Sequence, residues 1–290
     1  MEEKNCEILY KEPLSKYSYM RTGGIGEKLI FPLNVEGLAE SIKADSPIIL
    51  GNCSNVIFPD SGIKTPIVIT TKLKNISTYE KDGSFFITAE AGASLNALSK
   101  LAYESSLTGL EFAHGIPGTI GGAVFMNAGA YGGEIKDIFY ECVCIDKQGR
   151  EVTMTLEEMN FSYRHSVLQE KELILAKATF KLKKGDKAEI KALMDDLMER
   201  RKSKQPLEFP SVGSFFKRPE GYFAAKLIDD AGLKGFTVGG AAVSEKHSGF
   251  VINKGGATTA DILELARHVK ETVFEKFGVM LEEEARMITD

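Results

Sequence analysis

The chain has 290 residues, 43% hydrophobic and 27% charged, which is an ordinary balance for a folded globular protein. This length is too great for one simple core and about right for two domains. The net charge of −5 and the lack of a long basic run argue against a nucleic-acid-binding surface. No apolar segment approaches the length of a membrane span, so we expect no membrane insertion.

The N-terminal residues, MEEKNCEILYKEP, are charged and lack the apolar core of a signal peptide, so we expect a cytoplasmic protein. Cys6, Cys53, Cys142 and Cys144 do not have the spacing of a zinc site, and the cytosol disfavours disulfides. The four histidines are also scattered along the chain. We therefore expect no metal site and interpret the cysteines as structural or incidental.

The N-terminal part of the chain alternates between strand-like and helix-like segments. The pattern predicts a strand over Glu27–Pro32, a helix over Val35–Ala44, and strands over Pro47–Leu50 and Thr65–Thr70, which together form a βαβ-like unit. The polar turn Gly51–Asn55 directly follows the second strand. Ligands of open α/β sheets bind at such strand ends, although an ordinary turn fits this turn equally well.

The middle of the chain is rich in strands and poor in helices, which indicates an α+β lobe. Ser94 is a predicted cap for a helix that reaches about Ser105. One face of this helix is expected to carry Ala97, Leu98, Leu101 and Ala102. The predicted strands are Ser84–Gly92, a hairpin of Ile138–Ile145 and Val152–Leu156, and Leu173–Leu182.

The last part of the chain begins with its clearest helix, Lys187–Ser203, and a domain boundary is expected in the proline-containing turn that follows. The apolar positions of this helix are Ile190, Leu193, Met194 and Leu197. Further predicted elements are a helix over Ala224–Ala231, strands over Phe250–Asn253 and Val279–Leu281, and a capped helix over Thr259–Phe277. That capped helix carries Ile262, Leu263, Leu265, Ala266, Val269, Val273 and Phe274 as apolar positions.

The densest run of glycine and proline is His114–Glu134, HGIPGTIGGAVFMNAGAYGGE. Such residues let a backbone bend sharply or approach a ligand closely. The run holds no lysine or arginine, so it would have to bind an anion with backbone N–H groups. It is neither a P-loop nor a Rossmann fingerprint. A tight structural loop is the commoner meaning of such a run, and only the rest of the chain favours a ligand site.

Three polar clusters are further candidates for chemistry. Ser162–Ser166 contains an arginine in a predicted loop, where most arginines form surface ion pairs. In Ser211–Pro219, the hydroxyl of Ser214 follows a glycine. No Gly-x-Ser-x-Gly motif or His–Asp pair accompanies it, so a donor or binding role fits Ser214 better than a nucleophilic one. Glu282–Glu284 would usually be solvated, but a carboxylate within a strand also suits a cleft.

Together and in this order, these motifs resemble the UDP-N-acetylenolpyruvoylglucosamine reductases, the MurB family of flavoenzymes in peptidoglycan synthesis. The likeness covers nearly the whole chain, and the Pro117 loop and the Gly-Ser-Phe-Phe segment are its most specific pieces. The length resembles the shorter subtype, which lacks an inserted substrate-capping loop. The matching motifs are Arg21–Gly24, Gly51–Asn55, Gly115–Gly122, Asn127–Gly132, Tyr163–Arg164, Gly213–Lys217, Val243–Phe250 and Leu281–Arg286.

The resemblance implies an α+β fold, in which a two-lobed FAD-binding domain of the vanillyl-alcohol-oxidase (PCMH) type precedes a C-terminal α/β substrate domain. The implied lobes are residues 1–75 and 76–203, and the implied substrate domain is residues 204–290. FAD is expected to be held by the two glycine loops, largely through backbone contacts to its pyrophosphate. The implied cofactor-binding residues are Gly51, Asn52, Cys53, Ser54, Asn55, Gly115, Ile116, Pro117, Gly118, Thr119, Gly121 and Gly122.

The first loop departs from the family pattern, since relatives often carry Gly-Gly where this chain has Asn52 and Cys53. Backbone contacts survive such a change if the position requires no positive φ. Asn tolerates a positive φ better than Cys.

The implied reaction has two halves. NADPH passes hydride to flavin N5, and the reduced flavin then gives hydride to the β-carbon of the enolpyruvyl group, which yields UDP-N-acetylmuramate. The permanently charged Arg164 suits the enolate-like dianion that forms. Ser214 matches the family's proton donor, with Lys217 as a candidate helper. The implied substrate-binding residues are Tyr163, Gln205, Lys217 and Arg218.

Glu284 matches the family's catalytic glutamate, although the family's Leu-Glu-Pro-Glu-Val-Arg reads Leu-Glu-Glu-Glu-Ala-Arg here. Strand alternation would place Glu282 and Glu284 on the same face, so Glu282 is a second candidate for the role.

We expect a monomer that acts on a UDP-sugar enolpyruvyl ether with NADPH and serves cell-wall biogenesis, cell shape and cell division. One alternative is another FAD oxidoreductase of the same fold, such as a sugar or alcohol oxidase, which would consume oxygen without NADPH. The other is a non-catalytic nucleotide-binding module, for which replacing Ser214 or Glu284 would leave activity in cells unchanged.

Overall fold

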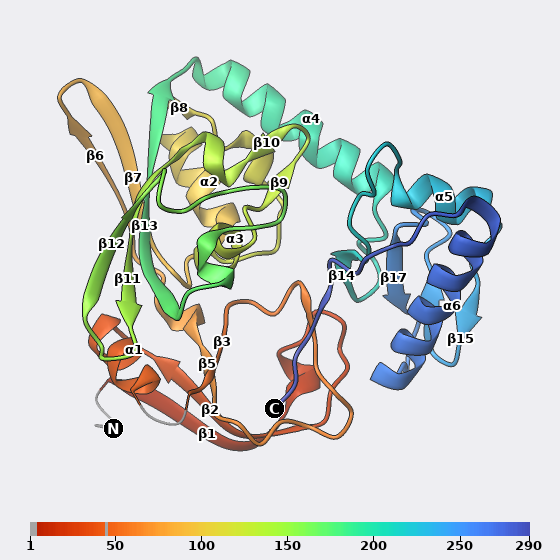
Figure 1. The fold of residues 1–290 in the computed structure, drawn as a ribbon. Helices are drawn as coiled ribbons and strands as arrows, with labels where there is room; N and C mark the ends of the chain where they lie inside the picture. Colours follow the sequence, from red (N-terminus) through yellow and green to blue (C-terminus); the bar gives the residue numbers. More distant parts are fainter. Residues whose placement is uncertain (1–4, 44–45) are drawn as a thin grey trace. The chain divides into compact units, whose positions relative to one another are not determined.

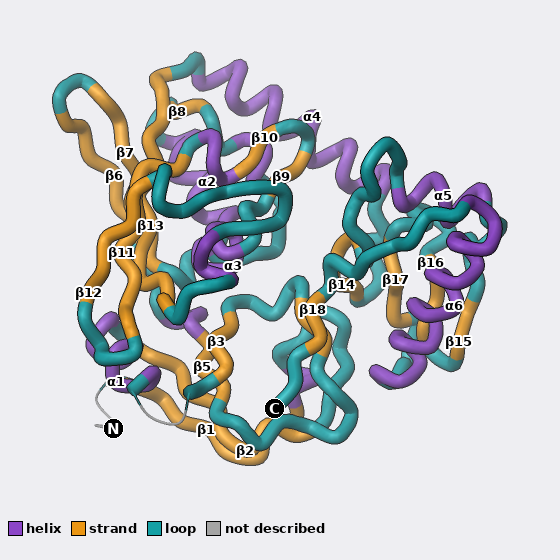
Figure 2. Tube along the Cα trace, in the orientation of Figure 1, coloured by secondary structure: helices purple, strands orange, loops and turns teal. Residues whose placement is uncertain are grey.

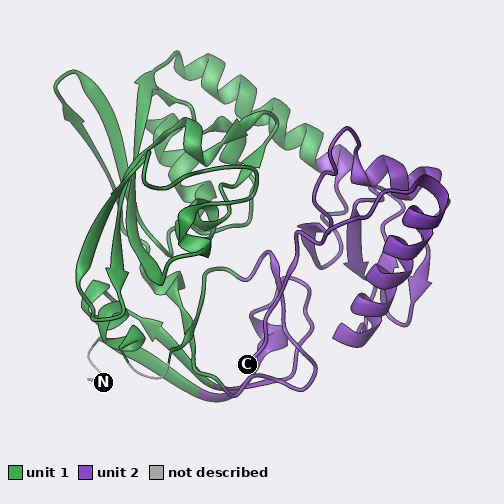
Figure 3. Ribbon diagram, in the orientation of Figure 1, with its two compact units in different colours: residues 1–9, 28–52, 65–201 green, residues 10–27, 53–64, 202–290 purple. Residues whose placement is uncertain are grey.

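The computed structural model describes residues 5–43 and 46–290, and the chain folds as two compact units (Figure 3). Unit 1 contains residues 1–9, 28–52 and 65–201, and unit 2 contains residues 10–27, 53–64 and 202–290. Each unit is therefore built from separate stretches of the chain. The division into lobes 1–75 and 76–203 and a domain 204–290 stays a prediction.

The first sheet confirms the predicted βαβ-like arrangement, with strand order β1-β2-β5-β3 and with β5 parallel to both β2 and β3. Helix α1 begins where the Asn34 side chain accepts a hydrogen bond from the Gly37 N–H, and it buries Leu38 and Ile42. Ala44, predicted to end this helix, lies outside the described residues. The elements are β1 (Cys6–Pro13), β2 (Ile25–Pro32), α1 (Val35–Ile42), β3 (Ile48–Leu50) and β5 (Ile67–Ile69).

The second sheet of unit 1 is antiparallel, with strand order β12-β11-β13-β7-β6 and β8 paired to β13. The predicted hairpin is confirmed, since Val143 of β11 pairs with Thr153 of β12. The strands are β6 (Ile76–Lys81), β7 (Ser84–Glu90), β8 (Leu107–Thr108), β11 (Phe139–Asp146), β12 (Glu151–Thr155) and β13 (Leu173–Lys184).

Two helices, α2 (Leu95–Glu104) and α3 (Ile120–Phe125), cover one face of this sheet and close the core of unit 1 (Figures 1 and 2). Ser94 caps α2 as predicted, because its side chain accepts a hydrogen bond from the Ala97 N–H. The predicted buried face is wrong at Ala97, which is exposed, because Leu95 and Ser99 occupy the packed side instead. Short strands β9 (Gly129–Ala130) and β10 (Gly133–Glu134) follow α3.

Helix α4 (Lys187–Lys204) confirms the clearest helix prediction, and the boundary between the units falls within it, after Arg201. Its buried residues are Ile190, Met194, Leu197 and Arg201. Leu193, predicted to be apolar and packed, is 46% exposed, whereas Arg201 is only 7% exposed. Periodicity therefore placed the helix correctly but misjudged which side chains it buries.

Unit 2 is built on an antiparallel sheet, β14-β17-β16-β15, packed against α6 and α5. A short parallel pair, β4 and β18, lies outside this sheet. The elements are β4 (Val56–Ile57), β14 (Ser211–Ser214), α5 (Ala224–Asp230), β15 (Thr237–Val238), β16 (Ala241–Val243), β17 (Phe250–Asn253), α6 (Thr259–Phe277) and β18 (Arg286–Met287).

One of the C-terminal predictions, the strand over Val279–Leu281, is wrong. Residues 279–281 form no strand, and the final strand is β18, because the partner strand β4 is available only there. Leu263 and Phe274 of α6 are 47% and 49% exposed, because only the opposite side of the helix packs on the core of unit 2. Within residues 5–43 and 46–290, no helix combines the length and the apolarity needed to cross a bilayer.

Candidate functional site

The two glycine loops, far apart in sequence, touch each other in unit 1. The Asn52 Nδ2 donates a hydrogen bond to the Pro117 carbonyl at 2.9 Å. A Cβ added to Gly51 would lie 2.1 Å from Thr119 Oγ1, which is closer than any real contact. Position 51 therefore has to be glycine for the loops to meet as they do.

Thr119 presents a polar atom that the protein itself does not satisfy. The residue is 4% exposed, and its Oγ1 finds no hydrogen-bond partner among the residues that the structure describes. The following N–H groups of Ile120 and Gly121 are held by the carbonyls of Ala93 and Ala91, which fix the start of α3. A buried hydroxyl without a partner has a free-energy cost, so this atom fits a bound polar ligand between the loops.

A cation lies against the glycine-rich loop, although the loop has none of its own. Gly115 has φ +81°, and a Cβ there would lie 3.1 Å from Nε of Arg201. The guanidinium of Arg201 also lies over the Tyr131 ring, 5.5 Å from its centroid. Burial lowers the pKa of Arg201, but the group remains cationic at neutral pH. The sequence did not single out Arg201, because no local pattern in α4 indicates which loop its side chain packs against.

The first loop continues into unit 2, where its backbone is strained at Cys53. Cys53 has φ +50°, in the left-handed region, and is 5% exposed. Burial also raises the pKa of its thiol to about 12. The condition for a harmless replacement of Gly-Gly is therefore not met, since this position does take a positive φ.

Asn55 ends the same loop and joins it to the C-terminal segment. Its Nδ2 donates to the Glu284 carbonyl at 3.0 Å, and its carbonyl accepts from the Arg286 N–H at 3.0 Å. Ser54, between Cys53 and Asn55 in this loop, is half-buried. The end of the first loop thus fixes the backbone around Glu284 within unit 2.

Arg164 sits at the tip of a tight turn in unit 1. Backbone hydrogen bonds join Ser162 and His165 in both directions, and Arg164 between them has φ +56°. Its guanidinium lies over the Tyr163 ring at 5.0 Å and donates to the Gly129 carbonyl at 3.4 Å. A left-handed arginine is uncommon, and such strain often marks a functional position.

Ser214 is aimed outward by a bulge in β14. Between Ser211 and Ser214 the register with β17 shifts, and Gly213 has φ +81°. A left-handed glycine in such a bulge kinks the strand and re-aims the next side chain. Ser214 is exposed, while Phe215 behind it is 1% exposed. The sheet therefore presents a hydroxyl on a rigid support.

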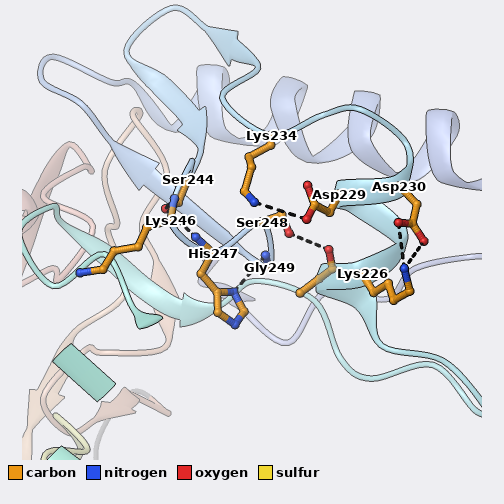
Figure 4. Close-up of polar contacts among 10 residues, drawn as sticks. Lys226, Asp229, Asp230, Lys234, Ser244, Lys246, His247, Ser248 and Gly249 are labelled. Atoms are coloured by element: carbon orange, nitrogen blue, oxygen red, sulfur yellow. Dashed lines mark hydrogen bonds and ion pairs between the residues drawn. The ribbon is translucent and has the colours of Figure 1, made fainter. Parts of the chain in front are cut away.

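The loop Ser244–Gly249, whose polar contacts Figure 4 shows, is hydrogen-bonded to the residue that follows Ser214. The Gly249 carbonyl accepts from the Phe215 N–H at 2.8 Å, and Ser248 Oγ donates to the Ala225 carbonyl at 2.6 Å. His247 Nδ1 accepts from the Gly249 N–H at 3.2 Å, and burial lowers the pKa of its ring. The motif Val243–Phe250 thus has a structural role beside Ser214.

The three C-terminal glutamates have different surroundings in unit 2. Glu282 is exposed and pairs with Lys217 at 3.2 Å, and Glu283 pairs with Lys270 at 2.9 Å. Glu284 is half-buried, and its N–H donates to the Phe215 carbonyl at 2.8 Å. The whole segment lies beside the segment that carries Ser214, since the Glu282 carbonyl also accepts from the Lys217 N–H at 2.8 Å. The lower exposure of Glu284 is what favours it over Glu282.

The remaining predicted substrate residues are also in unit 2, apart from Tyr163. Gln205 is half-buried, and its carbonyl accepts from the Leu207 N–H at 2.9 Å. Arg218 lies over the Phe223 ring at 4.5 Å. Arg164 belongs to unit 1, whereas Ser214 and Glu284 belong to unit 2, so their action on one substrate is part of the proposal below.

The cysteines are all buried and unbridged. The nearest pair, Cys142 and Cys144, has its sulfur atoms 3.6 Å apart. In the described part of the chain, no group of three or more His, Cys, Asp or Glu side chains could hold a metal ion.

Two protein-family models match the sequence. One is described as "UDP-N-acetylenolpyruvoylglucosamine reductase, C-terminal domain" and matches residues 205–288. The other is described as "FAD binding domain" and matches residues 38–155.

Curated relatives match along almost the full chain. A protein of Pediococcus pentosaceus is 48% identical over 97% of this chain and 94% of its own length. One of Limosilactobacillus reuteri is 49% identical over 98% and 96%, and one of Clostridium perfringens is 49% identical over 97% and 93%. All three carry the name UDP-N-acetylenolpyruvoylglucosamine reductase.

A solved structure agrees with the sequence relatives. The UDP-N-acetylenolpyruvylglucosamine reductase (MurB) of Thermus caldophilus is 32% identical, has a TM-score of 0.82, and matches over 97% of this chain and 98% of its own.

Proposed function

This chain belongs to the UDP-N-acetylenolpyruvoylglucosamine reductase family, and we propose that Arg164, Ser214 and Glu284 are the groups with which it carries out the family's reaction. It is an FAD-containing, NADPH-dependent oxidoreductase of peptidoglycan synthesis, which reduces UDP-N-acetylglucosamine enolpyruvate to UDP-N-acetylmuramate. Its fold is α+β, with an FAD-binding domain of the vanillyl-alcohol-oxidase type and a C-terminal substrate domain. The resemblance read from the motifs is thereby confirmed.

The contact between Gly51 and Thr119 is the observation that carries the cofactor site. It brings the loop Gly51–Asn55 to the loop Gly115–Gly122 and leaves the buried Thr119 hydroxyl for a ligand. These residues fit FAD because the buried Thr119 hydroxyl has no protein partner and suits a pyrophosphate oxygen, while the N–H groups of Ile120 and Gly121 hold the loop in place. Arg201, which lies against Gly115, adds a positive charge beside the loop Gly115–Gly122.

When bound, FAD supplies hydride transfer, taking hydride from NADPH and delivering it to the enolpyruvyl group. The chain's own residues must then manage charge and protons at the substrate. Negative charge develops on the substrate carboxylate, and the fixed guanidinium of Arg164 stabilises it there. Stacking on Tyr163 limits the motion of this guanidinium.

The Ser214 hydroxyl delivers the proton that completes the reduction. A serine is a weak acid, so it needs a cation nearby to favour its transient alkoxide. Lys217, three residues further along the chain, is the candidate, and its ammonium group pairs with Glu282 at 3.2 Å. The bulge at Gly213 holds the hydroxyl outward for this transfer.

Glu284 acts beside Ser214 as the acidic partner of the site. Its position is fixed twice, by the Phe215 carbonyl on its N–H and by the Asn55 amide on its carbonyl. Tyr163, Gln205, Lys217 and Arg218 then hold the sugar nucleotide. The charged UDP-sugar and NADPH are made and kept in the cytoplasm, so we place the enzyme there. We also propose that it is a monomer.

Rapid mixing tests the assignment by separating the two half-reactions. The Ser214→Ala and Glu284→Gln variants should keep the flavin spectrum and its reduction by NADPH. They should slow reoxidation by UDP-N-acetylglucosamine enolpyruvate by about 10²-fold or more, as for the loss of a general acid. Glu283, which pairs with Lys270 rather than with a proposed site residue, supplies the matched control: Glu283→Gln should reoxidise at nearly the wild-type rate.

Equal slowing of both halves would refute the roles given to Ser214 and Glu284. A large effect of Glu282→Gln without one of Glu284→Gln would move the catalytic role to Glu282. Light scattering checks the monomer.

A further inference from the structure

The turn that carries Arg164 is held by a side chain outside the motifs, Gln169. The Gln169 Nε2 donates to the Arg164 carbonyl at 2.9 Å and to the Phe125 carbonyl at 2.9 Å. Carbonyl oxygens only accept hydrogen bonds, so both contacts belong to the amide NH₂ group. Its two hydrogens can serve the two carbonyls at once.

Phe125 is the last residue of α3, the helix whose N-cap residue is Thr119 in the glycine-rich loop. Ser166, which is fully buried, also donates its hydroxyl to the Phe125 carbonyl at 2.9 Å. The carbonyl at the end of α3 therefore accepts hydrogen bonds from two side chains, those of Ser166 and Gln169. The Gln169 amide therefore joins α3, which begins in the glycine-rich loop, to the turn that carries Arg164.

The other end of the turn is held in a similar way. Asn127, two residues after α3, is fully buried and donates its Nδ2 to the Ser162 carbonyl at 2.9 Å. Its Oδ1 accepts from the Lys136 N–H at 3.0 Å. Two side-chain amides thus hold the turn Ser162–His165. Asn127 binds the carbonyl of its first residue, and Gln169 binds the carbonyl of its third residue, Arg164.

Such support is needed because Arg164 has φ +56°. A left-handed residue at the third position of a turn is ordinarily Gly or Asn, because a Cβ crowds the backbone of other residues there. Without a partner for its carbonyl, the turn would relax towards negative φ. The relaxation would rotate the peptide and change the direction of the guanidinium.

We propose that Gln169 is a positioning residue for Arg164, which locks the turn in its left-handed form and so aims the guanidinium at the substrate carboxylate. This inference rests on the proposed role of Arg164.

The test replaces Gln169 by Glu, which keeps the shape but cannot donate at neutral pH, and by Met, which has similar length and no polar group. In the FAD-loaded enzyme, both variants should keep the flavin spectrum and the rate of reduction by NADPH. Reoxidation by the enolpyruvyl substrate should slow about 10- to 100-fold, the scale of a misplacement near 1 Å. Gln148→Glu, at an exposed β11–β12 turn, is the matched control and should match wild type.

A double-variant cycle separates positioning from general damage to the fold. In an Arg164→Ala background, Gln169→Met should cause no further loss of reoxidation rate, because Gln169 acts only through Arg164. Additive losses, or a wild-type reoxidation rate in both Gln169 variants, would overturn the inference while leaving the role of Arg164 intact. If Arg164→Ala alone reoxidises at the wild-type rate, the proposed function fails instead.

Discussion

Backbone conformation at single residues shapes the loops of this enzyme more than their composition does. Cys53 and Arg164 are both left-handed without being glycine, at φ +50° and +56°. Each such residue costs on the order of 1–3 kcal/mol and persists only where the surroundings fix it. For Arg164 the hydrogen bond from Gln169 supplies that constraint. The Gly-Gly of related sequences at positions 52 and 53 pointed to a possible positive φ at Cys53, whereas no sequence pattern signalled the angle at Arg164.

At Gly51 the missing side chain is what lets the loops meet. Gly51→Ala would place a methyl 2.1 Å from Thr119 Oγ1, and the resulting overpacking should cost about 1–3 kcal/mol. We expect the purified variant to lose FAD on gel filtration, measured by the ratio of flavin to protein absorbance. Gly83→Ala, in the β6–β7 turn outside both loops, is the control, because its Cβ would meet no atom within 4 Å, and it should keep its FAD. Equal FAD content in the two variants would contradict the account of Gly51.

The Cys53 thiol predicts a loss of stability at high pH. Its pKa is about 12 in the folded protein, against about 8.5 for a free cysteine, so the folded state binds more protons between these values. The free energy of unfolding should therefore fall as pH rises, by up to about 1.4 kcal/mol per pH unit from this group. Urea unfolding at about pH 8 and about pH 10 measures the slope. Cys53→Ala should show a shallower slope, and an identical slope would count against the prediction.

At the scale of elements, the sequence located helices and strands well but judged their packed faces less well. Helix α6 was predicted with its ends, yet Leu263 and Phe274 lie on its exposed side. Apolar periodicity says which residues share a face, and only the neighbouring elements say how wide the covered part is. The final strand shows the same limit, since β18 forms where β4 is available to pair with it.

The N-terminus of α6 offers a test at this scale. Thr258 and Asp261 form a capping box, and the backbone N–H groups of Thr258 and Gly240 hold the pKa of the Asp261 carboxyl below its usual value. Thr258→Ala removes the hydroxyl acceptor and should lower the free energy of unfolding by about 1 kcal/mol. Thr258→Ser keeps a hydroxyl and should stay near wild type. A urea titration that finds no difference between the two variants would refute the role of the cap.

At the scale of the whole molecule, unit 2 is not the C-terminal stretch alone. It also contains residues 10–27 and 53–64, the two inserted segments. Met20 and Ile57, one from each inserted segment, are buried in its core. The Asn253 amide donates to the Met20 carbonyl at 3.0 Å, and the Thr259 hydroxyl donates to the Phe58 carbonyl at 2.7 Å. The C-terminal fold therefore depends on residues from near the start of the chain.

A fragment of residues 202–290 tests this dependence. Without the inserted segments it leaves the packed surface around Met20 and Ile57 open, so we expect no cooperative urea unfolding and poorly dispersed amide NMR signals. The full-length Met20→Ala variant is the companion measurement, with an expected cost of about 2–5 kcal/mol. A cooperatively folded fragment would show instead that residues 202–290 fold without the inserted segments.

The sequence by itself determined the family, the reaction and the identity of the two glycine loops, because these depend on residue types at fixed local spacing. It also located most helices and strands, since their periodicity is local. The tertiary structure decided what those motifs touch. It brought Gly51 to Thr119 and Arg201 to Gly115, placed Glu284 beside the Ser214 strand, and tied Arg164 to Gln169. Contacts between distant residues, and the dihedral angles they enforce, come from packing, which no local pattern encodes.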